Sequence, residues 1–332
     1  MSDIDIRVEG RVGRITLTRP QALNALSWDM ALAMERALDA WREDPAIAMV
    51  LVDAEGERAF CAGGDLQLLY ESGRSGDFGY GRRFWADEYR LNARIARFPK
   101  PYVALMQGFV MGGGVGISGH GSHRIVTGTT QIAMPECGIG LIPDVGGTWL
   151  LGHAPGRLGE YLGLTGARMG PADAILAGFA DAFVPAERFP ALREALLTDP
   201  LPDAVLPAFV TEPPAGSLAP RRAGIDAVFA GSLDDIRRAA DPEAQKAIAR
   251  ACPLSLACTL ELVRRARGLA RIEDALAEEY RFTARSMSEG EFLEGIRAQV
   301  IDKDRNPRWQ VAATPETVAA MLAPLGEMEL RL

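Results

Sequence analysis

Hydrophobic and polar residues alternate at the start of the chain. Apolar side chains occupy every second position of residues 4–9, and the alternation returns in residues 12–18 after Gly10. A period of two is typical of a strand that buries one face. The pattern therefore predicts a β-hairpin that ends at Arg19-Pro20.

The period lengthens to three and four residues after Ser27, which is a suitable N-cap for an amphipathic helix. Apolar side chains recur at this spacing at Met30, Met34, Ala37, Leu38 and Trp41. The continuous apolar run at residues 47–52 then predicts a buried strand, and two further strands are expected at residues 101–106 and 124–126. Because strands and helices alternate, we expect an α/β (mixed) fold.

A carboxylate interrupts the apolar face of a helix predicted over residues 83–98. Phe84, Leu91 and Ile95 define that face, and Glu88 lies in its middle. A buried carboxylate must be paired, protonated or placed in a polar cleft, because an isolated buried charge is prohibitively costly. A structural ion pair and a functional role fit the sequence equally well.

Six prolines interrupt the pattern in residues 199–220, and beyond them the chain is rich in Ala, Arg, Glu and Leu. Closely spaced prolines prevent regular structure and favour a connector. We therefore expect a core at residues 1–198 with both glycine loops described below, a connector at 199–222, and a helical C-terminal region at 223–332 that packs on the core.

Composition excludes several classes of protein. Apolar residues make up 48% and charged residues 24% of the 332 residues, which is typical of globular proteins. A net charge of −8 argues against nucleic-acid binding. No run reaches the ~18 apolar residues of a membrane span, and no signal peptide is apparent. The four cysteines lack CxxC spacing, and three histidines make a metal site improbable. We expect a cytoplasmic protein.

Two glycine-rich loops stand where predicted strands give way to helices. The first comprises Phe60–Asp65 and the second Met111–Gly114. Glycine allows a ligand to approach the backbone closely, and N–H groups at a helix start are unpaired. Two such groups that meet at one point would form an oxyanion hole. For any single Gly-Gly pair, a tight turn or close packing is the favoured explanation.

Residues 114–119 match the dinucleotide-binding pattern GxGxxG, with Glu136 as the acid that would bind a ribose. The context disfavours this alternative. Residues 108–113 separate the motif from its strand, and His120-Gly121 cuts the following helix short.

Two further acids follow the second loop. Glu136 comes after a short apolar run and Pro135, at a strand exit where ligand sites concentrate. Asp144, taken alone, is best explained as the cap of a helix that starts near Gly146. Acids beside glycine loops suit general acid–base or acyl-transfer chemistry.

These motifs together resemble the crotonase (enoyl-CoA hydratase/isomerase) superfamily. The motifs concerned are Arg19-Pro20, Asn24-Ala25-Leu26, the two glycine loops and Gly138-Ile139-Gly140. A second set resembles its 3-hydroxyisobutyryl-CoA hydrolase subfamily, in order and spacing from Arg19 to Trp309. This set is Glu88-Tyr89, Met111–Gly116, Ala133–Glu136, Ile142–Gly147, Glu294–Ala298 and Ile301–Asp304.

The resemblance implies a spiral of ββα units with a helical C-terminal region, and it assigns roles to individual residues. The backbone N–H groups of Gly64 and Gly113 would form the oxyanion hole for a thioester carbonyl. Glu136 and Asp144 would be catalytic. The remaining substrate-binding positions would be Glu88, Ala62, Asp65 and Leu66.

One departure bears on the reaction. Hydratases of the superfamily use two glutamates, and the first falls at position 116, which is Gly here. Hydration is therefore not expected, whereas hydrolysis or a one-glutamate Δ3/Δ2-enoyl-CoA isomerisation stays open. The Pro143–Gly147 segment favours hydrolysis of a short branched 3-hydroxyacyl-CoA. A non-catalytic acyl-CoA-binding protein is a weaker alternative. No metal or redox cofactor is expected, and a homo-oligomer is left open.

Overall fold

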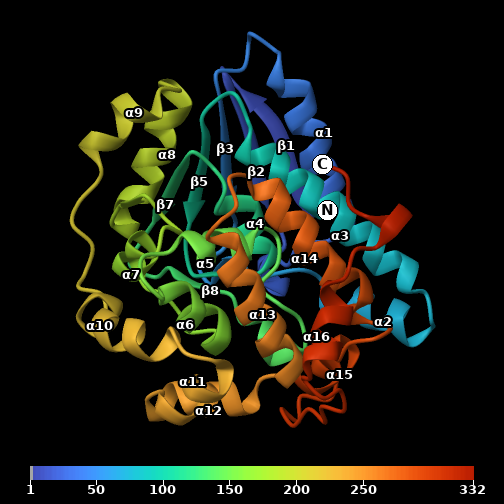
Figure 1. Ribbon diagram of the computed structural model, residues 1–332. Coiled ribbons are helices and arrows are strands. Elements are labelled where there is room, and N and C mark those ends of the chain that lie inside the picture. The colour runs from blue at the N-terminus through green and yellow to red at the C-terminus, as the bar shows by residue number, and fades with distance from the viewer. Residues whose placement is uncertain (1–2) are drawn as a thin grey trace. The chain divides into compact units, whose positions relative to one another are not determined.

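The computed structural model describes residues 3–332 (Figure 1). The chain folds into two compact units. Unit 1 comprises Met1–Gly64, Arg90–Ile132 and Met169–Ala219, and unit 2 comprises Asp65–Tyr89, Ala133–Arg168 and Pro220–Leu332. Each unit therefore contains three separate segments of the chain, whereas our prediction divided the chain in sequence order at residues 199–222.

Unit 1 is built on a six-stranded sheet in the order β1-β2-β3-β5-β7-β9. The predicted hairpin is confirmed, because β1 and β2 pair antiparallel, and the remaining pairs are parallel. The predicted runs at 47–52, 101–106 and 124–126 are confirmed as strands. The strands are β1 (Ile4–Glu9), β2 (Val12–Leu17), β3 (Met49–Ala54), β5 (Tyr102–Met106), β7 (His123–Val126) and β9 (Ala182–Phe183).

One hydrophobic cluster of unit 1 forms where apolar side chains of the parallel strands meet those of helix α8 (Phe189–Thr198). Val12, Leu51 and Val103 represent the strands, and Leu192 and Leu196 represent the helix. Every residue of β3 is buried, as expected for a central parallel strand covered on both faces.

The predicted N-cap is also confirmed in unit 1. Ser27 precedes α1 (Trp28–Arg42), its side chain accepts a hydrogen bond from the Met30 N–H, and the five predicted apolar positions are buried. The other helices of unit 1 are short. They are η1 (Pro20–Ala22), α4 (Gly113–Ser118), α7 (Pro171–Leu176), η3 (Ala186–Arg188), α9 (Pro202–Val205) and η4 (Leu206–Ala208).

A second, three-stranded sheet has the order β4-β6-β8 and comprises Ala59–Cys61, Phe109–Met111 and Gln131–Ala133. Strands of three residues are too short to show a hydrophobic period, so only β8 was anticipated, as a short apolar run. The glycine loops follow β4 and β6. Residues 114–118 of the GxGxxG match lie inside helix α4, so the dinucleotide-binding alternative is wrong.

Unit 2 is mainly helical, and residues 220–332 contain no strand. Helix α3 (Phe78–Ala96) covers residues 83–96 of the predicted helix 83–98, and its residues up to Tyr89 belong to unit 2. Helix α10 (Leu218–Phe229) begins at the end of unit 1. The remaining helices are α2 (Leu66–Arg74), η2 (Glu136–Ile139), α5 (Gly147–His153), α6 (Leu158–Thr165), α11 (Leu233–Ala239), α12 (Pro242–Arg250), α13 (Pro253–Ala266), α14 (Ile272–Ser286), α15 (Phe292–Ile296), the π-helix η5 (Arg297–Ile301), α16 (Pro315–Leu322) and η6 (Gly326–Met328).

Candidate active site

Glu88 occupies the position that the helix pattern predicted. It lies on α3 and is 2% exposed, between the buried side chains of Phe84 and Leu91. Its Oε1 atom is fully buried and has no hydrogen-bond partner in the protein. Because buried polar atoms are nearly always satisfied, an oxygen of this kind points to a ligand or a water molecule.

Glu136 is the second buried carboxyl group of unit 2. It follows β8 and Pro135, begins the 3₁₀ helix η2, and is 5% exposed. Its Oε2 atom is likewise buried without a hydrogen-bond partner. Both Glu88 and Glu136 therefore have a buried carboxyl oxygen without a hydrogen-bond partner in the protein.

Asp144 does not have the capping role that the sequence favoured. Helix α5 begins at Gly147, its N-cap is Gly146, and no side chain caps it. The Asp144 carboxylate instead accepts a hydrogen bond of 2.8 Å from the hydroxyl of Tyr89. Tyr89 lies on α3 next to Glu88, a tertiary contact that local pattern does not reveal. Asp144 is thus a buried acid with its own donor.

Electrostatic interactions link these three acids. Burial is the largest cause that raises the pKa of Glu88, Glu136 and Asp144. The negative charge of Asp144 raises the pKa of Glu88 and of Glu136 further, so Asp144 acts on both. The Tyr89 hydrogen bond opposes the effect of burial on the pKa of Asp144. Acids with raised pKa values suit proton transfer near neutral pH.

The two glycine loops lie side by side in unit 1, because they follow the paired parallel strands β4 and β6. A Cβ atom on Gly114 would lie 2.2 Å from the carbonyl oxygen of Cys61, so only glycine fits there. Gly63 adopts a φ of +115°, which also requires glycine. Gly113 is the first residue of α4, and its N–H has no acceptor within the helix.

The sequence of this chain matches the family model described as "Enoyl-CoA hydratase/isomerase" over residues 12–325. The chain belongs to the enoyl-CoA hydratase/isomerase family. The resemblance inferred from the motifs is thereby confirmed, and the mixed α/β fold class expected from the alternation of strands and helices is confirmed by the structure.

Two relatives of this enoyl-CoA hydratase/isomerase family member are named as 3-hydroxyisobutyryl-CoA hydrolases. The 3-hydroxyisobutyryl-CoA hydrolase, mitochondrial, of Gallus gallus is 36% identical over 100% of this chain and 91% of its own length. The 3-hydroxyisobutyryl-CoA hydrolase 1 of Arabidopsis thaliana is 36% identical over 93% of this chain and 87% of its own.

Two solved structures are similar over the entire chain. One, described as an enoyl-CoA hydratase from Rhodobacter sphaeroides, is 52% identical with a TM-score of 0.93 and 100% coverage of both chains. The other, described as a carnitinyl-CoA dehydratase from Mycobacterium thermoresistibile, is 46% identical with a TM-score of 0.94, and covers 100% of this chain and 99% of its own.

The remaining predicted substrate-binding residues flank the first glycine loop of this family member. Ala62 is half-buried in the loop, and its N–H donates to the Leu23 carbonyl at 3.0 Å. Asp65 and Leu66 are half-buried at the start of α2. Their contacts with a substrate stay predictions.

Sequence reasoning missed a further buried acid of unit 2, which lies beside Asp144. Glu279 on α14 is 0% exposed, and it contacts Gly146 and Thr148 just beyond Asp144. The signal was available, because Glu279 stands between Leu276 and Thr283 on a buried helix face, as Glu88 does on α3.

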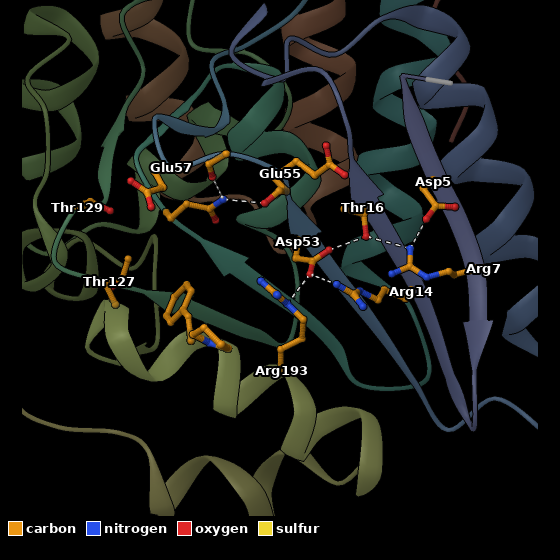
Figure 2. Close-up of a pocket in the computed structure, with 16 residues that line it drawn as sticks. Asp5, Arg7, Arg14, Thr16, Asp53, Glu55, Glu57, Thr127, Thr129 and Arg193 are labelled. Atoms are coloured by element: carbon orange, nitrogen blue, oxygen red, sulfur yellow. Dashed lines mark hydrogen bonds and ion pairs between the residues drawn. The ribbon is translucent and has the colours of Figure 1, made fainter. Parts of the chain in front are cut away.

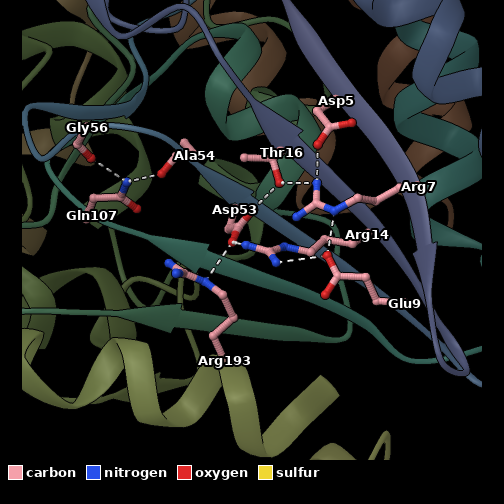
Figure 3. Close-up of polar contacts among 10 residues, drawn as sticks. All are labelled: Asp5, Arg7, Glu9, Arg14, Thr16, Asp53, Ala54, Gly56, Gln107 and Arg193. Carbon is pink, nitrogen blue, oxygen red and sulfur yellow. Dashed lines mark hydrogen bonds and ion pairs between the residues drawn. The ribbon is translucent and has the colours of Figure 1, made fainter. Parts of the chain in front are cut away.

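Unit 1 of this family member also contains a separate cavity of about 730 Å³ (Figure 2). Its basic side chains are already neutralised. Arg14 and Arg193 both pair with Asp53 at 2.8 Å, and Arg7 pairs with Asp5 and Glu9, as Figure 3 shows. The cavity therefore has no surplus positive charge and is not a good site for the phosphate groups of coenzyme A.

Within residues 3–332, none of the helices combines the length and the apolar character that crossing a membrane requires.

Proposed function

We propose that this protein hydrolyses the thioester of 3-hydroxyisobutyryl-CoA to 3-hydroxyisobutyrate and coenzyme A, a reaction of valine catabolism. The observation that carries the proposal is the full-length similarity to curated relatives of that name, at 34–36% identity in animals and plants. The buried acids of unit 2 supply the chemistry that a thioester hydrolase needs.

The proposed mechanism begins at the thioester carbonyl. The backbone N–H groups of Gly64 and Gly113 donate to its oxygen and stabilise the negative charge of the tetrahedral intermediate. Glu136 either removes a proton from the attacking water or attacks the carbonyl carbon itself. In the first route the intermediate collapses, and the leaving thiolate of coenzyme A takes up the proton that Glu136 removed. In the second route the thiolate leaves and takes up a proton, and water then cleaves the acyl-enzyme anhydride.

The other two acids have supporting roles. The unused Oε1 of Glu88 is suited to accept a hydrogen bond from the 3-hydroxyl group of the substrate. Asp144 raises the pKa of Glu136, so that Glu136 takes up a proton more readily during catalysis. Ala62, Asp65 and Leu66 would line the acyl-CoA site. The reaction needs no metal or redox cofactor, since coenzyme A is part of the substrate.

Hydration or dehydration is the second candidate, because the two solved structures described above bear hydratase and dehydratase names. The residue at position 116 distinguishes the candidates. Gly116 carries no carboxylate, whereas the resemblance places the first of two hydratase glutamates there. A Δ3/Δ2-enoyl-CoA isomerase would need only Glu136. A non-catalytic acyl-CoA-binding protein would need no catalytic glutamate at position 116 or at position 136.

A panel of acyl-CoA substrates tests the proposal. Free thiol is measured with a chromogenic disulfide for 3-hydroxyisobutyryl-CoA, and loss of the enoyl absorbance is measured for crotonyl-CoA. We expect rapid thiol release and negligible hydration. Comparable hydratase turnover, or isomerisation of a 3-enoyl-CoA without thiol release, would replace the hydrolase assignment with the corresponding alternative.

The cellular location is a separate proposal. We propose that the protein acts in the cytoplasm, without nucleic-acid or membrane partners, although vertebrate relatives are named as mitochondrial. Cell fractionation with antibody detection tests the location. Sedimentation of the purified protein would show whether a homo-oligomer forms.

A further inference from the structure

The carboxylate of Glu279 holds the backbone of the turn that carries Asp144. Its Oε2 atom accepts a hydrogen bond from the Gly146 N–H at 2.8 Å, and its Oε1 atom accepts one from the Thr148 N–H at 2.9 Å. The Thr148 hydroxyl donates to the same Oε1 atom. Both carboxylate oxygens are thus committed to residues 146–148 and do not face a ligand.

The turn needs this support, because its conformation is unfavourable by itself. Val145 has a φ of +54°, a region that β-branched residues rarely occupy, and Gly146 follows with a φ of +79°. Strained backbone of this kind persists only where surrounding contacts over-determine it. The hydrogen bond of 2.6 Å from the Gly147 N–H to the Asp144 carbonyl is local, whereas Glu279 provides the tertiary contacts.

The same helix supports the other side of Asp144. Thr283 lies one turn beyond Glu279 on α14, and its Oγ1 atom is 3.3 Å from the Tyr89 hydroxyl that donates to Asp144. Helix α14 therefore contacts the backbone that follows Asp144 and also the donor to the Asp144 side chain. A displacement of α14 would move Asp144 relative to Tyr89.

We propose that Glu279 is a positioning residue for thioester hydrolysis, which acts by fixing the turn at residues 144–148 so that Asp144 stays oriented for catalysis. The inference rests on the proposed function of Asp144. Glu279 itself contacts backbone and Thr148 rather than the reacting atoms. Its removal should therefore lower kcat and leave KM nearly unchanged, because small displacements of catalytic groups cost up to ~100-fold in rate.

The variant Glu279→Gln tests the inference. Glutamine has a similar size, but its amide donor would face either the Gly146 N–H or the Thr148 donors, so at least one hydrogen bond is lost. We expect kcat for thiol release to fall by ~10-fold or more, with KM changed by less than ~3-fold. A folded Glu279→Gln variant that keeps the wild-type kcat overturns the inference.

Unit 1 offers a matched control. Asp173 is also buried, and its carboxylate accepts hydrogen bonds from two backbone N–H groups and one hydroxyl, those of Ser217 and Leu218. Asp173→Asn removes the same kind of contact at a turn without a candidate catalytic residue. We expect Asp173→Asn to lower the melting temperature but to keep kcat. An equal loss of kcat in both variants would show that Glu279 has only a structural role.

A double-mutant cycle with Asp144→Asn shows whether Glu279 acts through Asp144. If it does, Glu279→Gln has little further effect on kcat once Asp144 is changed. Independent, multiplicative effects overturn the inference. If Glu279→Gln does not fold, Thr148→Val replaces it as the test, because it removes only the hydrogen bond from the Thr148 hydroxyl to Glu279. We then expect a smaller loss of kcat, and an unchanged kcat overturns the positioning role of Glu279. Failure of the wild-type protein to release thiol would instead refute the proposed function.

Discussion

Tyr89 and Asp144, 55 residues apart in the sequence, are joined by a buried hydrogen bond from the tyrosine hydroxyl to the Oδ2 atom of the carboxylate. The bond stabilises the ionised form of Asp144, whereas burial stabilises the protonated form. Asp144 in turn raises the pKa of Glu88 and Glu136. The ionisation of three acids therefore depends on one phenolic hydroxyl.

Tyr89→Phe removes this hydroxyl and should shift the pH dependence of hydrolysis. Without the donor, the pKa of Asp144 rises further, because burial is then opposed by one hydrogen bond fewer. If ionised Asp144 is required, the acid limb of the kcat profile moves to higher pH. Tyr280→Phe is the control, because the Tyr280 ring packs edge-on against Tyr89 but its hydroxyl donates to the Arg82 carbonyl. Identical shifts in both variants would contradict this role of Tyr89.

Glu136→Gln should abolish catalysis and stabilise the protein. Thiol release should fall by at least ~100-fold, since the base or nucleophile is lost, while acyl-CoA still binds. Because the folded-state pKa of Glu136 is raised above 4.5, the wild-type protein loses stability as pH rises from about 4.5 through that raised pKa. The Glu136→Gln variant does not lose this stability, because glutamine does not ionise.

Thermal unfolding between pH 4.5 and pH 8 measures the difference between Glu136→Gln and the wild type. We expect similar melting temperatures at the acid end and a higher melting temperature for the variant at pH 8. Glu289→Gln, at an exposed position, should show no such divergence. A constant difference across the pH range would mean that Glu136 titrates normally.

Gly114→Ala should distort the second glycine loop. The added Cβ would lie 2.2 Å from the Cys61 carbonyl oxygen, which belongs to the backbone of β4 and cannot turn away. We expect a destabilisation of about 1–3 kcal/mol and a loss of kcat as the Gly113 N–H moves. Gly128→Ala, where no atom lies within 4 Å of the new Cβ, should be neutral. If a folded Gly114→Ala protein keeps the wild-type kcat, the second glycine loop does not take part in catalysis.

Asp53→Asn should destabilise unit 1 without changing the chemistry. Its carboxylate side chain is 3% exposed and pairs with Arg14 and Arg193. Its loss leaves Arg193 without this partner and Arg14 with Glu9 alone, at a cost of about 3 kcal/mol. Asp5→Asn removes a carboxylate that is 52% exposed and pairs with Arg7, and should cost less than ~1 kcal/mol. Urea unfolding of both variants tests the contrast, and equal costs would contradict it.

The sequence by itself determined the elements whose side chains repeat at a clear period. The hairpin at residues 4–18 and the helix after Ser27 are encoded locally, because burial of one face imposes a period of two or of three to four. The same reasoning placed Glu88 in a buried position. Family motifs located Glu136 and the two glycine loops.

Only the tertiary structure decided which groups contact the acids. Asp144 has the spacing of a helix cap, yet its carboxylate bonds to Tyr89 and the helix begins at Gly147 without it. Glu279 reaches Gly146 from 133 residues away. The hydrophobic period of a segment predicts whether a side chain is buried. It does not predict which residue that side chain contacts, because the contacts depend on the packing of helices that are distant in the sequence.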